Sequence, residues 1–271
     1  PRSTPLYSSA ASDVYKRQVM FYKLTFLQMN KLTIGILLTD HVLDDLKPKH
    51  GDQDDFYSKI FGEADTNIKL KIYDVTLNNY PTDINECDGY IITGSKLSVY
   101  DDEKWIRDLE QYIRNLNQNK KSLLGVCFGH QLIAQALGGE VCKAEIGWVT
   151  GLQTYTYHDN FPWLKDLNQE IKLIHSHQDQ ITKLPDRAKL VASNKDVPIA
   201  MYYIDNHIMS IQGHPEFTNE YAYDVVCKRR DIIGEELFKR TEESLLNETS
   251  SYLEVTNWWI EFFKYQFKIQ S

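Results

Sequence analysis

The sequence predicts a single α/β domain built on a doubly wound, mostly parallel β-sheet. Strand-like and helix-like segments alternate along the chain, which is typical of parallel strands joined by helical crossovers. The first strand-like segment, 32–38, is continuously apolar, as expected of a strand that is covered on both faces. The chain has 271 residues, of which 42% are hydrophobic, so it can bury one sizeable core. No internal repeat or low-complexity linker divides the sequence, and one domain is therefore expected.

The individual elements follow from the spacing of apolar residues. Alternation predicts a strand at 68–75, and 89–93 is a short apolar strand that ends at Gly94. Residues 105–116 carry apolar side chains at helical spacing. Further strands are predicted at 122–124, 152–157, 171–174, 190–192, 199–204 and 207–211, and further helices at 132–137, 221–240 and 252–267.

The last predicted helix carries an aromatic stripe. Its members are Trp258, Trp259, Phe262, Phe263 and Phe267. Such a stripe most often packs against a sheet, and a surface for docking a partner is the alternative.

A cysteine lies between two glycines at a predicted strand-to-helix junction, in the segment Gly125-Val126-Cys127-Phe128-Gly129-His130-Gln131. The glycines at 125 and 129 permit a turn too tight for Cβ atoms, and this turn would hold Cys127 out at the end of the strand. The N-terminus of the next helix would favour the thiolate over the thiol. The remaining cysteines, Cys87, Cys142 and Cys227, lack such flanks and are interpreted as structural.

A histidine and a glutamate two residues apart complete the pattern, in the segment Gly213-His214-Pro215-Glu216-Phe217. Side chains at positions i and i+2 of an extended segment project from the same face. Glu216 can therefore bind one imidazole nitrogen of His214 while the other nitrogen faces the sulfur of Cys127. These three residues predict a nucleophile, a base and an orienting acid.

Composition excludes several other classes of function. A formal net charge of −8 argues against nucleic-acid binding, and the basic run Lys228-Arg229-Arg230 is interpreted as a solvated helix face. The four cysteines and eight histidines show no metal-ligand spacing, so no metal or other cofactor is expected. No apolar run approaches the roughly 20 residues that span a bilayer. Unpaired cysteines are typical of a reducing compartment, and we expect a cytoplasmic protein that binds neither membranes nor nucleic acid.

Residues 1–18 are set apart from the fold. The stretch lacks periodicity, and 13–18 resemble a translated sequencing-adapter tail. We interpret 1–18 as a non-native artefact segment, with an organelle transit peptide as the alternative. The native start is then Met20 or Met29.

The two segments around Cys127 and His214 together resemble the class I (triad) glutamine amidotransferase family. Residues 90–96 are similar to the family's strand and glycine loop, and 175–185 to the GMP synthase-type amidotransferase domain. Residues 98–105 point to the stand-alone GMP synthase-like members and the related plant γ-glutamyl peptidases. The resemblance implies a flavodoxin-like catalytic domain at 29–221. We expect residues 222–271 to form helices packed on the same domain.

The resemblance also implies an activity and roles for particular residues. Cys127, His214 and Glu216 would be the triad that hydrolyses the γ-carboxamide of L-glutamine through a cysteinyl thioester. Backbone N–H groups of Gly94 and Phe128 would form the oxyanion hole. Gln131, Ser176 and His177 would contact the substrate, although a structural strand end is an equal alternative for His177 and its neighbour His175.

Two departures from the family pattern bear on the function. The loop Gly94-Ser95-Lys96 lacks the proline that many members carry, so we expect it to become ordered only on binding. The chain also shows no nucleotide-binding loop that would consume ammonia. Either a separate synthetase subunit takes the ammonia, or the protein hydrolyses γ-glutamyl amides, such as glutathione-like peptides, in its own right.

Three other classes of protein stay open. An α/β-hydrolase with a cysteine elbow would place its acid on a separate loop before the histidine, whereas Glu216 follows His214. A redox-responsive relative would use the cysteine as a stress sensor and would lack the His-x-Glu pair. A non-catalytic subunit could retain the fold.

Overall fold

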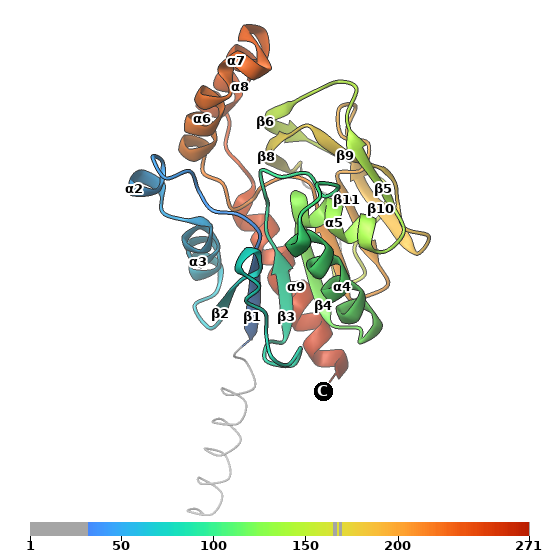
Figure 1. The fold of residues 1–271 in the computed structure, drawn as a ribbon. Coiled ribbons are helices and arrows are strands. Elements are labelled where there is room, and N and C mark those ends of the chain that lie inside the picture. Colours follow the sequence, from blue (N-terminus) through green and yellow to red (C-terminus); the bar gives the residue numbers. More distant parts are fainter. Residues whose placement is uncertain (1–31, 165–166, 168–169, 271) are drawn as a thin grey trace, which may run out of the picture.

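The computed structural model describes residues 32–164, 167 and 170–270, with side chains up to 266 (Figure 1). The predicted artefact segment 1–18 and both candidate start residues, Met20 and Met29, lie outside the described residues. The α/β prediction is confirmed: a large, mostly parallel sheet lies between two layers of helices.

The central sheet has eight strands within the described part of the chain. In spatial order these are β2 (Lys69–Asp74), β1 (Thr33–Leu38), β3 (Gly89–Ile92), β4 (Ser122–Val126), β12 (Ile208–Ile211), β11 (Met201–Ile204), β10 (Ala188–Ser193) and β7 (Thr156–Tyr157). Strands β2 to β12 pair in parallel, and β11, β10 and β7 continue the sheet antiparallel. Strands β3, β4 and β12 are therefore neighbours, and their carboxyl ends meet at one edge of the sheet, where ligands bind in open α/β folds.

Two antiparallel ribbons complete the β-structure. One pairs β5 (Glu140–Lys143) with β9 (Asp179–Lys183), and the other pairs β6 (Val149–Thr154) with β8 (Lys172–His177). A bridge between Ile174 and His214 joins β8 to the chain after β12. The second ribbon is thus fastened to the end of the central sheet.

Helices cover both faces of the sheet. On one face α4 (Lys104–Gln118) and α5 (Phe128–Ala136) bury their apolar side chains, and on the other face α3 (Gln53–Ala64) and α9 (Tyr252–Gln270) do so (Figure 1). The short helix α2 (Lys47–His50) and the 3₁₀ turn η1 (Val75–Leu77) lie in the connections. No described helix is both long and apolar enough to traverse a bilayer.

The aromatic stripe of α9 packs in the core, as predicted. Trp258, Trp259, Phe262 and Phe263 are buried, and Trp259 packs near Tyr57 of α3. These four side chains therefore do not form an exposed docking surface. The side chain of Phe267 lies outside the described ones.

The sequence predicts one continuous helix at 221–240, and this prediction is wrong. The structure has three helices there, α6 (Asn219–Lys228), α7 (Arg230–Ile233) and α8 (Glu235–Asn247). Gly234 separates α7 from α8 with a φ of +82°, a conformation that glycine adopts at little cost. The pattern missed the breaks because apolar spacing continues across them. The break before α7 is where Arg229 leaves the helix.

Candidate active site

The turn after β4 is as tight as its two glycines predict. Cys127 has a φ of +50° and a ψ of −101°, a strained conformation for a residue with a Cβ, of a kind that costs about 1–3 kcal/mol. A Cβ at Gly129 would lie 2.4 Å from the carbonyl oxygen of Ile92. A Cβ at Gly125 would lie 2.7 Å from the carbonyl oxygen of Gly129. Strand β4 and helix α5 can therefore approach closely enough to hold Cys127 at the junction.

Two backbone N–H groups near Cys127 have no acceptor among the described residues. They belong to Phe128, the first residue of α5, and to Gly94, which follows β3. A Cβ at Gly94 would lie 2.9 Å from Cε1 of His214 and 3.7 Å from Cβ of Cys127. Both N–H groups therefore belong to backbone next to the sulfur, as expected of the donors predicted to stabilise an oxyanion.

His214 is held from three sides. Its Nδ1 is 2.7 Å from Oε1 of Glu216, and its ring stacks on Phe217 with centroids 3.9 Å apart. Its backbone N–H donates to the carbonyl oxygen of Ile174 in β8, at 2.8 Å. Both side chains of the His214–Glu216 pair are buried. The imidazole is therefore fixed in orientation, with Nε2 available toward the sulfur of Cys127.

Electrostatics keep His214 protonated at neutral pH. Burial alone would lower the pKa of this imidazole. The negative charges of Glu216 and a Cys127 thiolate, with hydrogen bonds to both, outweigh burial and raise the pKa of His214 to about 10. The arrangement therefore places an imidazolium, which can donate a proton, beside the sulfur of Cys127.

The loop after β3 is held in place without a proline. The backbone N–H of Lys96 donates to Asp40 at 2.8 Å, and its Nζ pairs with the same carboxylate at 2.9 Å. The carbonyl oxygen of Gly94 accepts hydrogen bonds from Thr39 Oγ1 at 2.9 Å and Gln53 Nε2 at 3.2 Å. Asp40 therefore anchors this loop in the structure, and the expectation that the loop becomes ordered only on binding stays a prediction.

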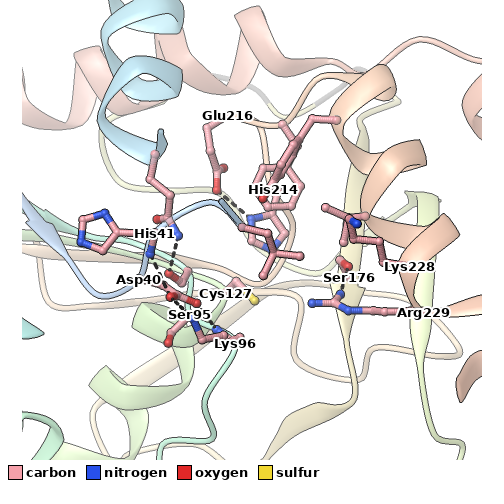
Figure 2. A pocket seen from close by; sticks show the side chains of 16 residues that line it. Asp40, His41, Ser95, Lys96, Cys127, Ser176, His214, Glu216, Lys228 and Arg229 are labelled. Atoms are coloured by element: carbon pink, nitrogen blue, oxygen red, sulfur yellow. Dashed lines mark hydrogen bonds and ion pairs between the residues drawn. The ribbon is translucent and has the colours of Figure 1, made fainter. Parts of the chain in front are cut away.

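Two cavities meet at Cys127. The larger, of about 270 Å³, is lined by His214 and Glu216. The smaller, of about 50 Å³, is lined by Phe128, Gln131 and Asp179 but not by His214. Both cavities are also lined by Ser95, Lys96, Ser176 and Arg229. Figure 2 shows the sulfur between the His214–Glu216 pair on one side and Ser176 with Arg229 on the other.

The structure brings the three predicted substrate contacts to the smaller cavity, where their side chains are already engaged. Gln131 Nε2 donates to the carbonyl oxygen of Asp179 at 2.8 Å. Ser176 Oγ accepts a hydrogen bond from Arg229 at 2.6 Å. His177 is buried, and both of its ring nitrogens have partners within the protein. The roles of these residues toward substrate stay predictions.

His177 belongs to a buried chain of hydrogen bonds in which each donor and each acceptor can be assigned in only one way. Burial lowers the pKa of His177 to about 3 and that of His175 well below its usual value, so both rings are neutral. His177 Nδ1 must donate to the carbonyl oxygen of Asp179, 3.0 Å away, because a carbonyl only accepts. His177 Nε2 then accepts from His175 Nδ1 at 2.8 Å, and His175 Nε2 accepts from the Tyr155 hydroxyl at 2.6 Å. This chain fixes the end of β8 beside the site.

Sequence reasoning did not find two charged side chains that line the smaller cavity. Asp179 accepts hydrogen bonds from the hydroxyl groups of Ser98 at 2.5 Å and Tyr100 at 2.9 Å. Arg229 was placed on a solvated helix face, and this is wrong, because the chain break after α6 brings its guanidinium into the cleft. No signal in the basic run distinguishes Arg229 from its exposed neighbours. No cluster of metal-ligating side chains occurs among the described residues.

Comparison with known proteins agrees with this geometry. The model of the class-I glutamine amidotransferase family matches residues 56–228. The chain belongs to the class-I glutamine amidotransferase family. Members of this family are enzymes with a cysteine nucleophile, and the alternative folds considered from the sequence, such as an α/β-hydrolase, are set aside.

The proteins similar to this chain include gamma-glutamyl peptidases and GMP synthases. Gamma-glutamyl peptidase 4 of Arabidopsis thaliana is 33% identical over 150 residues, which cover 53% of this chain and 59% of that protein. One subunit of the glutamine-hydrolyzing GMP synthase of Sulfolobus acidocaldarius is 34% identical over 150 residues, covering 55% of this chain and 78% of its own length. A solved glutamine amidotransferase of Thermotoga maritima shares the fold, with a TM-score of 0.66, 17% identity and coverage of 86% of this chain and 97% of its own.

Proposed function

We propose that this protein hydrolyses the γ-carboxamide of L-glutamine through a cysteinyl thioester, with Cys127, His214 and Glu216 as its triad. The observation that carries the proposal is the buried His214–Glu216 pair, 2.7 Å apart, beside a cysteine held in a strained turn. Membership in the class-I glutamine amidotransferase family supports the same chemistry.

The first half-reaction forms the thioester and releases ammonia. The Cys127 thiolate attacks the γ-carbonyl carbon, and its electron pair forms the C–S bond as the carbonyl oxygen becomes an oxyanion. The N–H groups of Gly94 and Phe128 are available to bind this oxyanion, at about 3 kcal/mol of barrier each. His214 gives its Nε2 proton to the departing nitrogen while Nδ1 stays bound to Glu216. The C–N bond breaks and ammonia leaves.

The second half-reaction restores the enzyme. Neutral His214 takes a proton from water, and the resulting hydroxide adds to the thioester carbonyl carbon. Collapse of this second tetrahedral species breaks the C–S bond and expels the thiolate. Glutamate is released, and the imidazolium–thiolate pair is regenerated without a metal or other cofactor.

A separate synthetase subunit is the partner that this proposal implies, because released ammonia needs an acceptor. The similarity to one subunit of a GMP synthase supports such a partner. The described cysteines form no disulfide, and a reactive thiolate suits a reducing compartment, so we place the activity in the cytoplasm.

Hydrolysis of γ-glutamyl peptides is the second candidate, and the larger cavity favours it. A leaving group must lie beside His214, which protonates it, and His214 lines the cavity of about 270 Å³ rather than the smaller one. Ammonia needs no space of this size, whereas an amino acid or short peptide does. The similarity to γ-glutamyl peptidases supports this candidate.

A substrate panel tests both candidates. The protein and its Cys127→Ala variant would be given L-glutamine, glutathione and other γ-glutamyl amides, with glutamate release as the readout. We expect turnover that depends on Cys127. Preference for glutamine would support a glutaminase that needs an ammonia acceptor, and preference for a γ-glutamyl peptide would support the peptidase. No turnover of any member would contradict the proposed chemistry.

A further inference from the structure

Arg229 is a cation in the cleft that forms no ion pair among the described residues, although Asp40 and a Cys127 thiolate are close enough to favour its charge. The other basic side chains that line the larger cavity pair with carboxylates: Lys96 with Asp40, Lys228 with Asp45, His41 with Asp52 and Asp74, and His214 with Glu216. No carboxylate of the described residues lies within ion-pair distance of Arg229. A half-buried guanidinium in this position is suited to bind an anion that comes from outside the chain.

The guanidinium is fixed in orientation before any ligand arrives. Its Nη1 donates to Ser176 Oγ at 2.6 Å, and its central carbon lies 4.7 Å from the ring centroid of Trp148. Burial lowers the pKa of Arg229, which shows that its charge has lost part of its hydration, although an arginine stays protonated. An anion that binds there would stabilise the guanidinium charge in place of the hydration that burial removed.

A carboxylate without a cationic partner lines the same small cavity. Asp179 is 8% exposed, and its partners are the neutral hydroxyls of Ser98 and Tyr100. No lysine, arginine or histidine of the described chain forms an ion pair with it. A small cavity lined by one carboxylate and one guanidinium, neither of which forms an ion pair within the described chain, is complementary to a zwitterion.

We propose that Arg229 binds the α-carboxylate of the γ-glutamyl substrate, with Asp179 facing the α-ammonium group. This inference rests on the proposed function, which requires that the γ-carbonyl of the same molecule reach Cys127. Cys127, Asp179 and Arg229 all line the smaller cavity. Arg229 lines both cavities, whereas Asp179 lines only the smaller one and His214 only the larger one, so the ammonium and the carboxylate of one zwitterion can both be bound only in the smaller cavity.

Arg229 is then a specificity-determining residue supplied by the C-terminal helices. It lies between α6 and α7, and the match to the family model ends at residue 228. The α-carboxylate would therefore be bound by a residue just beyond the segment that matches the family model, and the C-terminal helices would complete the substrate site.

Binding to an inactive protein tests the assignment directly. In a Cys127→Ala background, calorimetry would measure the affinity for L-glutamine and for its α-amide, in which a carboxamide replaces the α-carboxylate. We expect Arg229→Gln to weaken L-glutamine binding by about 10- to 100-fold, the range for a lost hydrogen bond to a charged group. The α-amide should bind equally to both proteins. Arg229→Lys, which retains the charge, should lose less.

Arg230→Gln is the matched control. Arg230 is the next residue, is exposed and pairs with Glu235, so its loss should leave the affinity for L-glutamine unchanged. Thermal unfolding would confirm that all variants fold. Equal affinity of the Arg229→Gln and Arg230→Gln proteins for L-glutamine would overturn the proposal. So would an equal loss for both ligands, or no binding of L-glutamine to the Cys127→Ala protein.

The proposed function and this inference can fail separately. If binding depends on Arg229 as expected but no γ-glutamyl substrate is turned over, the chemistry is wrong and the assignment of Arg229 stands. If substrates are turned over and Arg229→Gln leaves KM unchanged, the assignment alone is wrong. Alkylation of Cys127 by uncharged iodoacetamide should be unaffected by Arg229→Gln. A slowed alkylation with an unchanged KM would show that Arg229 acts on the thiolate instead.

Discussion

Replacing Glu216 by glutamine isolates the charge that keeps His214 protonated. The amide has the shape of the carboxylate and can still accept the hydrogen bond that spans 2.7 Å to Nδ1, so the change removes charge with little change in volume. A hydrogen bond to a charged group is worth about 1.5–3 kcal/mol, and 1.36 kcal/mol corresponds to one pKa unit. We therefore expect the pKa of His214 to fall from about 10 by about 1–2 units in Glu216→Gln.

The same shift links folding stability to pH. The folded protein binds the proton of His214 more tightly than the unfolded chain, in which the pKa is near its ordinary value of 6.5. The resulting stabilisation is fully present below pH 6.5 and is lost as the pH rises through about 10. In Glu216→Gln the lower pKa of His214 makes this stabilisation smaller at neutral pH. The free energy of unfolding of the variant should therefore fall less between neutral pH and pH 10 than that of the wild type.

Titration of the His214 imidazole by NMR is the direct assay, with denaturant unfolding at several pH values alongside. Glu220→Gln serves as a control, because Glu220 is an exposed glutamate at the start of α6. Turnover in Glu216→Gln should fall by about 10²–10⁴-fold, the usual contribution of a positioned acid–base group. An unchanged pKa of His214 in Glu216→Gln would refute the argument that Glu216 sustains the imidazolium.

Three further predictions concern the supports of the site. Gly129→Ala places a methyl group 2.4 Å from a carbonyl oxygen of β3, and it should lower the free energy of unfolding in urea by about 1–3 kcal/mol and abolish activity. The control is Gly62→Ala in α3, where the added methyl group meets no atom within 4 Å and should be neutral or stabilising. Asp40→Ala releases the loop after β3 and should lower kcat/KM by about 10- to 100-fold with little change in Tm; equal kinetics would show that the loop is fixed by other means. His177→Leu leaves the buried Nδ1–H of His175 without an acceptor and should lower the free energy of unfolding by about 1–3 kcal/mol; a stability equal to wild type would argue against the assigned proton arrangement.

The sequence was sufficient for the fold and for the turn that presents Cys127. Glycine spacing and apolar runs are local signals, and they predicted the parallel strands and the strained elbow because each depends on few neighbours. The buried contact of His214 with Glu216 followed from their spacing of two residues in an extended segment. For these features the local pattern determines the geometry.

Contacts made by distant segments could not be predicted in the same way. Arg229 enters the cleft because the helix breaks there, and Asp40 anchors Lys96 across 56 residues of sequence. Neither contact leaves a periodic or compositional trace. Likewise, whether His177 faces substrate or the protein depends on its neighbour His175 and on the turn at Asp179, which a one-dimensional pattern does not contain.

The hydrogen-bonded chain from Tyr155 to Asp179 resembles a proton wire but cannot conduct protons. It ends on a carbonyl oxygen, which has no proton to release, so the polarity of the chain cannot be reversed at neutral pH. Passing a proton along it would require a charged intermediate ring, which burial makes unfavourable. The hydrogen-bonded chain behind β8 therefore supplies no protons to the reaction and accepts none from it. We therefore expect the protons that His214 gives or receives during turnover to travel through the cleft, by way of the substrate or the water that enters there.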